Sequence, residues 1–89
     1  MKNILVVCGN GLGSSLMMEM AVKEVAKKIG LEADVTHTDL SSAKSRTADI
    51  FVCAADLTPH LEDQGKSNII SLTNIFDKVT IETQLLTFL

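Results

Sequence analysis

The chain has 89 residues, of which 46% are hydrophobic, 21% charged and 3% aromatic, with a formal net charge of −3 at pH 7. This length suits a single domain over residues 1–89, and the scarcity of aromatics predicts an aliphatic core. The chain is acidic overall and its basic residues are scattered, so it lacks the basic stripe that nucleic-acid binding requires. Two cysteines are fewer than a secreted disulfide scaffold normally carries, and no apolar stretch approaches the ~20 residues of a membrane span. We therefore expect a reduced, cytoplasmic protein that does not insert into a membrane.

The N-terminal half predicts a strand, a helix and a second strand. A run of β-favouring aliphatics over 4–7 predicts a strand at 3–7, and apolar residues recur at helical spacing over 14–29. Lys27 and Lys28 in the last turn, followed by Gly30, are the expected end of that helix. Apolar and polar residues alternate weakly over 32–36 and predict a second strand. The polar segment 38–42 then predicts the cap of one short helical turn.

The C-terminal half continues the alternation of strands and helices. Residues 48–55 form a near-continuous apolar run, which predicts a central parallel strand buried on both faces. Residues 56–62 predict the start of a helix with proline in its first turn, and a turn at 64–66 leads into a strand at 68–72. Asn74 is expected to cap a final amphipathic helix over 75–89, with Asp77 in its first turn.

Strands that alternate with helices imply βαβ units with right-handed crossovers. The predicted fold is therefore a small three-layer, doubly wound α/β domain with a four-stranded parallel sheet and a Rossmann-like topology. In such sheets ligands bind outside the carboxyl ends of the strands, where the strand order reverses, usually beside the first strand. Cys8 directly follows the predicted first strand and so lies at this position.

A glycine-rich loop surrounds this cysteine at the predicted strand-to-helix turn. Such a turn gathers backbone N–H groups and the positive end of the helix dipole, which bind an anion and favour a thiolate over a thiol. Glycines let the backbone approach the anion closely, and serines at a helix start cap exposed N–H groups or donate to a phosphoryl group. The expected nucleophile is Cys8, and the expected phosphate-binding residues are Gly9, Asn10, Gly11, Leu12, Gly13, Ser14 and Ser15.

Cysteine–phosphate loops of the low-molecular-weight tyrosine phosphatase kind share this arrangement, with the pattern Cys, five residues, Arg, Ser. Here Ser14 stands where that arginine would be. A guanidinium grips the equatorial oxygens of a transferring phosphoryl group, so its absence predicts poor hydrolysis. A site that binds a phosphoryl group covalently but hydrolyses it slowly is suited to hold the group and transfer it to another acceptor.

The loop from Cys8 to Ser15, continued by Leu16, Met17 and Met18, closely resembles that of the IIB components of the bacterial sugar phosphotransferase system. Within them it is most similar to the ascorbate type of the ascorbate/galactitol group, and less to the lactose/chitobiose branch. The resemblance implies that Cys8 accepts a phosphoryl group from a phosphohistidine of a IIA protein and delivers it to a sugar in the membrane IIC permease. It also implies a cytoplasmic protein that associates peripherally with that permease. No cofactor is implied.

Other candidate residues carry weaker signals. Asp56 follows the third predicted strand and could be a general acid, although capping a helix is the favoured role. His37 and His60 are expected at the surface, with His60 a possible contact of the phosphoryl group. Cys53 is expected to be a core thiol, and no Cys/His spacing indicates a metal site.

Two rival functions stay open from the residues alone. A phosphatase or arsenate reductase on the same sheet would use Cys8 and Asp56, but the missing arginine opposes it. A dinucleotide-binding module would use the glycines of the loop, with Asp39 binding the ribose. Against this second rival, the chain is short for two nucleotide-binding halves, the third glycine is displaced by one position, and the cysteine has no role.

Overall fold

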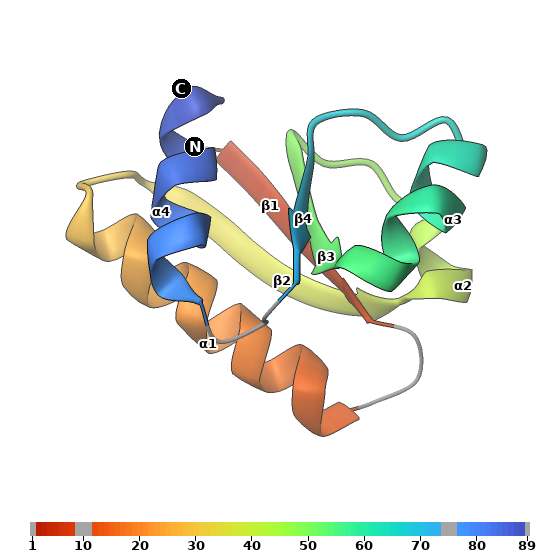
Figure 1. Cartoon of the computed structure of the whole chain (residues 1–89), viewed down its shortest axis with the longest axis horizontal. Helices are drawn as coiled ribbons and strands as arrows, with labels where there is room; N and C mark the ends of the chain where they lie inside the picture. The colour runs from red at the N-terminus through yellow and green to blue at the C-terminus, as the bar shows by residue number, and fades with distance from the viewer. Residues whose placement is uncertain (1, 9–11, 74–76, 89) are drawn as a thin grey trace.

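The structure, a computed structural model, describes residues 2–8, 12–73 and 77–88, with only the backbone described at 12–15. Strands and helices alternate along the chain as the sequence predicts (Figure 1). The elements are β1 (Lys2–Cys8), α1 (Leu12–Lys28), β2 (Ala33–Asp39), α2 (Leu40–Ala43), β3 (Ile50–Ala54), the 3₁₀ turn η1 (Ala55–Leu57), α3 (Thr58–Asp63), β4 (Ile69–Leu72) and α4 (Lys78–Thr87).

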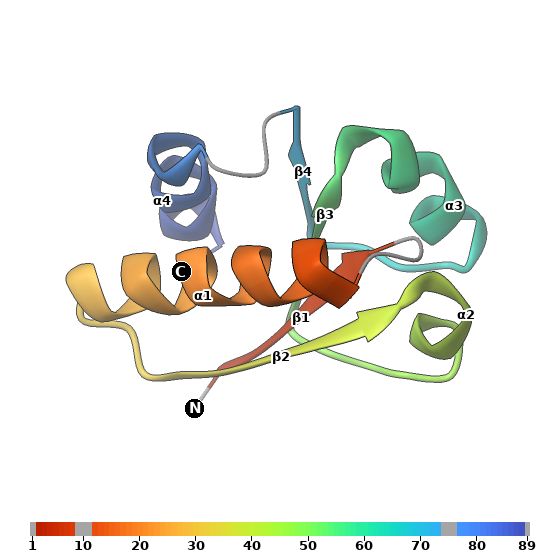
Figure 2. The ribbon, with the colours of Figure 1, turned by 90° about the horizontal axis from the view of Figure 1, so that it is seen from below.

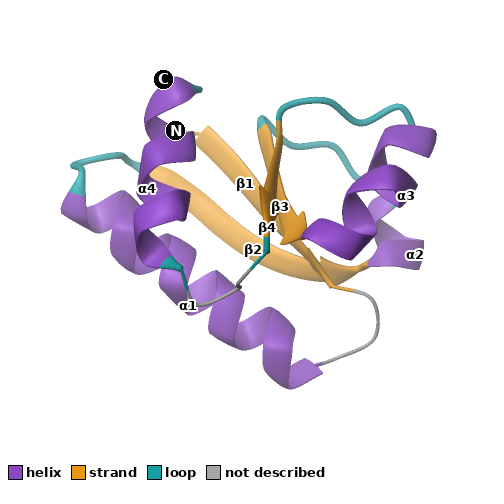
Figure 3. Cartoon of the chain, viewed as in Figure 1, coloured by secondary structure: helices purple, strands orange, loops and turns teal. Residues whose placement is uncertain are grey.

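The four strands form one parallel sheet in the order β2-β1-β3-β4 (Figure 3). After β1 the chain moves outward to β2, then crosses back over β1 to β3. The strand order therefore reverses at β1, whose last residue is Cys8. Helices α1 and α4 cover one face of the sheet and α2 and α3 the other (Figure 2). This arrangement confirms the predicted three-layer, doubly wound α/β fold.

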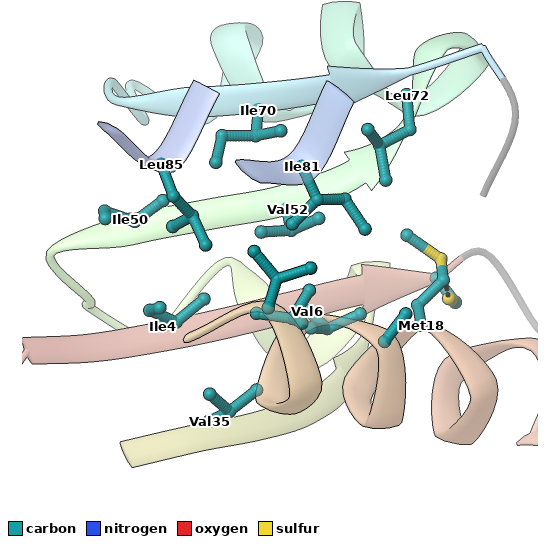
Figure 4. Close-up of a cluster of buried hydrophobic side chains, with 14 residues drawn as sticks. Ile4, Val6, Met18, Val35, Ile50, Val52, Ile70, Leu72, Ile81 and Leu85 are labelled. Carbon is teal, nitrogen blue, oxygen red and sulfur yellow. Dashed lines mark hydrogen bonds between the residues drawn. The ribbon is translucent and has the colours of Figure 1, made fainter. Parts of the chain in front are cut away.

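The core is aliphatic and lies on both faces of the sheet. Because side chains alternate along a strand, Ile4, Val6 and Cys8 of β1 project toward α1 and α4, while Leu5 and Val7 project toward α2 and α3. The larger cluster joins the strands to both covering helices (Figure 4), through Met18, Val22 and Val25 of α1 and Ile81 and Leu85 of α4. The smaller cluster adds Ala43, Phe51, Cys53 and Leu61.

Several predicted boundaries are wrong by a few residues. Helix α1 begins at Leu12, two residues before the predicted start. Its end agrees with the prediction, because Gly30 just beyond the helix has the expected positive φ of +74°. Strand β2 runs on to Asp39 because its whole length pairs with β1, which the weak alternation over 32–36 does not indicate. Strand β3 is shorter than its apolar run.

The helix caps explain two further differences. The Asp39 carboxylate accepts a hydrogen bond from the Ser42 backbone N–H at 2.6 Å, which confirms the predicted cap over 38–42. Helix α4 begins at Lys78 rather than at 75, because the Asp77 carboxylate caps it by accepting from the Thr80 N–H at 3.1 Å. The predicted cap Asn74 lies outside the described residues.

Two neighbouring leucines on α4 test this packing. Leu85 is fully buried and Leu86 is 53% exposed. We expect Leu85→Ala to lower the free energy of unfolding by about 2–5 kcal/mol, because it leaves a cavity in the core. Leu86→Ala, the matched control, should change it by less than about 0.5 kcal/mol. Urea denaturation measures both, and equal losses would mean that α4 does not present this face to the sheet.

Candidate functional site

Cys8 ends β1 at the point where the strand order reverses. It lies opposite Asp39 in β2, and the preceding residue, Val7, lies opposite Cys53 in β3. The Cys8 side chain is 7% exposed and faces α1, where its thiol donates to the Met18 sulfur at a Sγ–Sδ distance of 3.5 Å. A thioether is a weak, uncharged acceptor. The sulfur of Cys8 is therefore held at the edge of the core by an uncharged contact.

The N-terminus of α1 follows Cys8 after only three residues. In the first turn of a helix the backbone N–H groups lack intrahelical partners, and here they belong to Leu12, Gly13 and Ser14. These donors and the helix dipole favour an anion at this end of α1. Gly9, Asn10 and Gly11, which complete the predicted cradle, lie outside the described residues.

The earlier start of α1 changes the positions of the predicted loop residues. Ser14 and Ser15 are the third and fourth residues of the helix rather than its first two. Gly13 also lies inside the helix, where φ is negative, and does not supply a left-handed turn. The backbone N–H groups of this turn are donors that the described structure offers to an anion.

The predicted secondary residues are not brought into contact with Cys8 in the described part of the chain. Asp56 lies exposed within η1, and the predicted capping role is wrong, because the cap positions of η1 and α3 belong to Ala54 and Leu57, without side-chain bonds. Asp56 does follow β3 at the carboxyl edge of the sheet, as predicted. His60 is exposed on α3, which covers the face opposite to the Cys8 side chain.

Cys53 is a core thiol, as predicted. It is fully buried on the α2/α3 face, and both cysteines are free. Because Cys8 and Cys53 project from opposite faces of the sheet, they do not pair in this fold. Burial raises the pKa of the Cys53 thiol, a contact with the Thr58 hydroxyl at 3.5 Å opposes that shift, and the charge of Asp56 adds to it.

A charged cluster on the α1 face is not among the predicted features. Glu19 is 8% exposed, and its carboxylate lies 3.0 Å from Nδ1 of His37 and 3.6 Å from Nζ of Lys23. His37 is partly exposed, as predicted, but it belongs to β2, which was expected to end before it. The i, i+4 spacing of Glu19 and Lys23 was the available signal. The cluster ties α1 to the edge strand β2.

The position of Cys53 yields a pH prediction. Cys53→Ala should lower the free energy of unfolding by about 1–3 kcal/mol at pH 7, because it removes a buried side chain. The raised pKa means that the folded state favours the neutral thiol. The stability that Cys53 contributes is thus fully present below the ordinary thiol pKa of about 8.5 and is lost as the pH rises above it.

The measurement is thermal unfolding of the wild type and of Cys53→Ala from pH 6 to 10. The advantage of the wild type should shrink above about pH 8.5. A constant or growing difference would mean that the Cys53 thiol is not held in an apolar site.

Comparisons with known proteins place this geometry in a family. Residues 3–86 match the family model described as "PTS system, Lactose/Cellobiose specific IIB subunit". Among curated proteins, the chain is 28% identical over 85 residues to an ascorbate-specific PTS system EIIB component of Mycoplasma pneumoniae, covering 93% of this chain and 90% of that protein. It is 27% identical to the corresponding protein of Escherichia coli O157:H7, covering 93% and 84%.

Two further matches link this chain to longer and solved proteins. A mannitol-specific EIICB component of Streptococcus pneumoniae is 31% identical over 74 residues, which cover 82% of this chain but 13% of that larger protein. The solved lactose-specific IIB domain of Streptococcus pneumoniae superposes with a TM-score of 0.64 at 15% identity, covering 97% of this chain and 92% of that one. At this identity the second match concerns the fold alone.

Proposed function

The chain belongs to the IIB subunit family of the sugar phosphotransferase system, and we propose that it is a phosphocarrier whose Cys8 takes a phosphoryl group from a phosphohistidine of a IIA protein. Cys8 then passes the group to a sugar bound by a IIC permease. The observation that carries this proposal is the position of Cys8 at the end of β1, where the strand order reverses and four residues before the first residue of α1. Ligands of doubly wound sheets bind at this position.

The proposed reaction has two transfers. In the first, the thiolate of Cys8 attacks the phosphorus of the phosphohistidine, the N–P bond breaks as the S–P bond forms, and the imidazole leaves. In the second, a sugar hydroxyl attacks the phosphocysteine, an O–P bond replaces the S–P bond, and the thiolate is regenerated while the hydroxyl proton is released. Backbone N–H donors of Leu12, Gly13 and Ser14 would bind the phosphoryl oxygens in both steps.

The identity of the sugar rests on the relatives. The relatives from Mycoplasma pneumoniae and Escherichia coli, which match nearly the whole chain, are ascorbate-specific components, whereas the family model is described by lactose and cellobiose. We assign L-ascorbate or a related sugar or polyol, because the glycine-alternating loop from Cys8 to Gly13 also resembles the ascorbate type. Membership of the family makes a IIC permease the expected membrane component. No helix in the described ranges is long and apolar enough to cross a bilayer.

The rival functions fit the geometry less well. Ser14 occupies the phosphatase arginine position and lies inside the first turn of α1, so a phosphatase would lack its guanidinium there. The dinucleotide module needs the Asp39 carboxylate for a ribose. That carboxylate caps α2 instead, and hydrogen bonds from Ser42 lower its pKa.

Replacing the nucleophile tests the covalent role. We expect Cys8→Ser to abolish phosphoryl transfer to sugar and to leave the fold intact, because a serine hydroxyl is a far weaker nucleophile than a thiolate at this site. The assay is sugar phosphorylation by the reconstituted system, with circular dichroism as a check of folding. Cys53→Ala, the matched control at the other cysteine, should retain transfer. Activity in the serine variant would rule out Cys8 as the carrier.

The phosphatase comparison predicts the effect of restoring the arginine. Ser14→Arg should tighten phosphate binding and speed hydrolysis of the phosphocysteine, because the guanidinium would contact the phosphoryl oxygens. Delivery to sugar should fall accordingly. Both chains are phosphorylated by one donor, the donor is removed, and the loss of phosphocysteine is followed by mass spectrometry. Equal decay and equal phosphate affinity would show that residue 14 does not face the phosphoryl group.

A further inference from the structure

We propose that Met18 is a positioning residue for the carrier cysteine: its thioether sulfur holds the unphosphorylated Cys8 thiol turned toward the core, and phosphorylation breaks this contact. The inference rests on the proposed function and adds to it a residue that acts on Cys8 without touching the phosphoryl group. It is carried by the contact between the two sulfur atoms, by the packing that fixes Met18, and by the chemistry of a thiol donor.

The first observation is the contact between the two sulfur atoms. The Cys8 thiol donates to Sδ of Met18 over 3.5 Å, and the two residues are 7% and 1% exposed. The other buried members of the cluster around them are aliphatic side chains. The Met18 sulfur is therefore the acceptor that this cluster offers to the thiol.

The second observation is the packing that holds Met18 in place. Met18 lies at the end of the core cluster nearest the arrowhead of β1 (Figure 4), in a cluster built by the sheet, α1 and α4. The next residue, Glu19, ties α1 to β2 through Nδ1 of His37 at 3.0 Å. A methionine side chain is otherwise adaptable, and Met17 and Met20 of the same helix are 51% and 55% exposed. Of these three methionines, Met18 is the one whose sulfur is held by the core.

The third observation is that the contact belongs to the protonated thiol alone. A thioether only accepts, so the bond needs the S–H proton of Cys8. A thiolate has no proton to donate, and in a phosphocysteine the S–P bond replaces the S–H bond. A phosphoryl group of about −2 charge does not fit a nearly buried position among aliphatic side chains. The phosphorylated sulfur therefore turns away from Met18, toward the N–H donors in the first turn of α1.

This difference acts on both transfers of the proposed reaction. Before the first transfer, the Cys8 thiol gives its proton to solvent and leaves Met18, and the thiolate forms the S–P bond as the N–P bond of the phosphohistidine breaks. After the second transfer, the regenerated thiolate takes up a proton and returns to Met18. An interaction made only by the free thiol opposes uptake of the phosphoryl group and favours its delivery by the same factor. Met18 thus biases the carrier toward the sugar.

The test removes the sulfur of residue 18 and keeps the volume of the side chain. Met18→Leu is a volume-conserving exchange between two good helix formers, and it leaves the thiol without its acceptor. Met17→Leu, the matched control, makes the same exchange one residue away at an exposed position. Circular dichroism checks folding. Norleucine in place of every methionine, which keeps the side-chain shape without the sulfur, is the second replacement if Met18→Leu folds poorly.

The charged groups on this face of the sheet are the same in every chain of the test. They come from β2, α1 and α4 and include Asp39, His37, Glu19, Lys23, Lys78 and Glu82. A difference between the pH profiles of two chains therefore reports the exchanged methionine.

The first readout is the alkylation of Cys8 by iodoacetamide between pH 6 and 10, followed on the Cys8 peptide by mass spectrometry. We expect Met18→Leu to react about two- to fivefold faster than the wild type at pH 7, which corresponds to one weak hydrogen bond. The difference should vanish near pH 10, where an ordinary thiol is ionised and makes no such bond. Met17→Leu should match the wild type at every pH.

Several results would overturn the positioning role. Equal or slower alkylation in Met18→Leu at pH 7 would show that the sulfur contact does not hold the thiol. A faster reaction that persists at pH 10, or that extends to the buried Cys53, would also overturn it, because that pattern reports a loosened core.

The second readout is the equilibrium of the phosphoryl group between a phosphorylated IIA protein and Cys8 at pH 7. At a fixed ratio of the two donor forms, the ratio of phosphorylated to free chain should rise about two- to fivefold in Met18→Leu, by the factor seen in alkylation. An alkylation effect without this shift would overturn the loss of the contact on phosphorylation. A wild-type chain that takes no phosphate on Cys8 overturns the proposed function instead, and the alkylation profiles then support or overturn the Met18 contact by themselves.

Discussion

The pairing of β1 between β2 and β3 is the constraint on which the rest of the structure depends. Because β1 is buried on both faces, its side chains pack alternately into the two hydrophobic clusters, and the strand is therefore aliphatic from Ile4 to Val7. The same pairing makes β1 the strand at which the order reverses. The pairing fixes the backbone of Cys8 at the carboxyl edge of the sheet, and the contact with Met18 holds its thiol.

Helix α1 connects this pairing to the chemistry. Its inner side packs on β1 and places the Met18 sulfur against Cys8, and Glu19 ties the helix to His37 on β2. Its first turn directs N–H groups toward the carboxyl edge of the sheet. Its outer side exposes Met17 and Met20. A single helix therefore contacts the thiol and, in the proposed mechanism, binds the phosphoryl group.

The fold was predictable from the sequence because strand and helix periods alternate clearly, and long apolar runs such as 48–55 mark buried parallel strands. The extent of β2 was not predictable from the sequence, because its pairing with β1 stabilises residues such as His37 that have no strand signal of their own. The start of α4 at Lys78 depends on the Asp77 cap, and helix boundaries in general depend on tertiary packing, which local propensity does not determine.

At the site, the position of Cys8 was predictable, since it needs only the end of a strand and the glycines that follow. The contact with Met18 and the Glu19–His37 pair join elements that are distant in the sequence, so no local pattern reveals them. The capping role predicted for Asp56 was wrong because the cap positions of η1 and α3 fall at Ala54 and Leu57.

The most direct test of the account is to find where the phosphate is carried. The wild-type chain is incubated with a phosphorylated IIA protein and digested, and the phosphorylated peptide is identified by mass spectrometry under conditions that preserve S–P and N–P bonds. The account predicts one phosphate, on the peptide that contains Cys8 and on its sulfur. Phosphate on Cys53, His37 or His60, with none on Cys8, would contradict it.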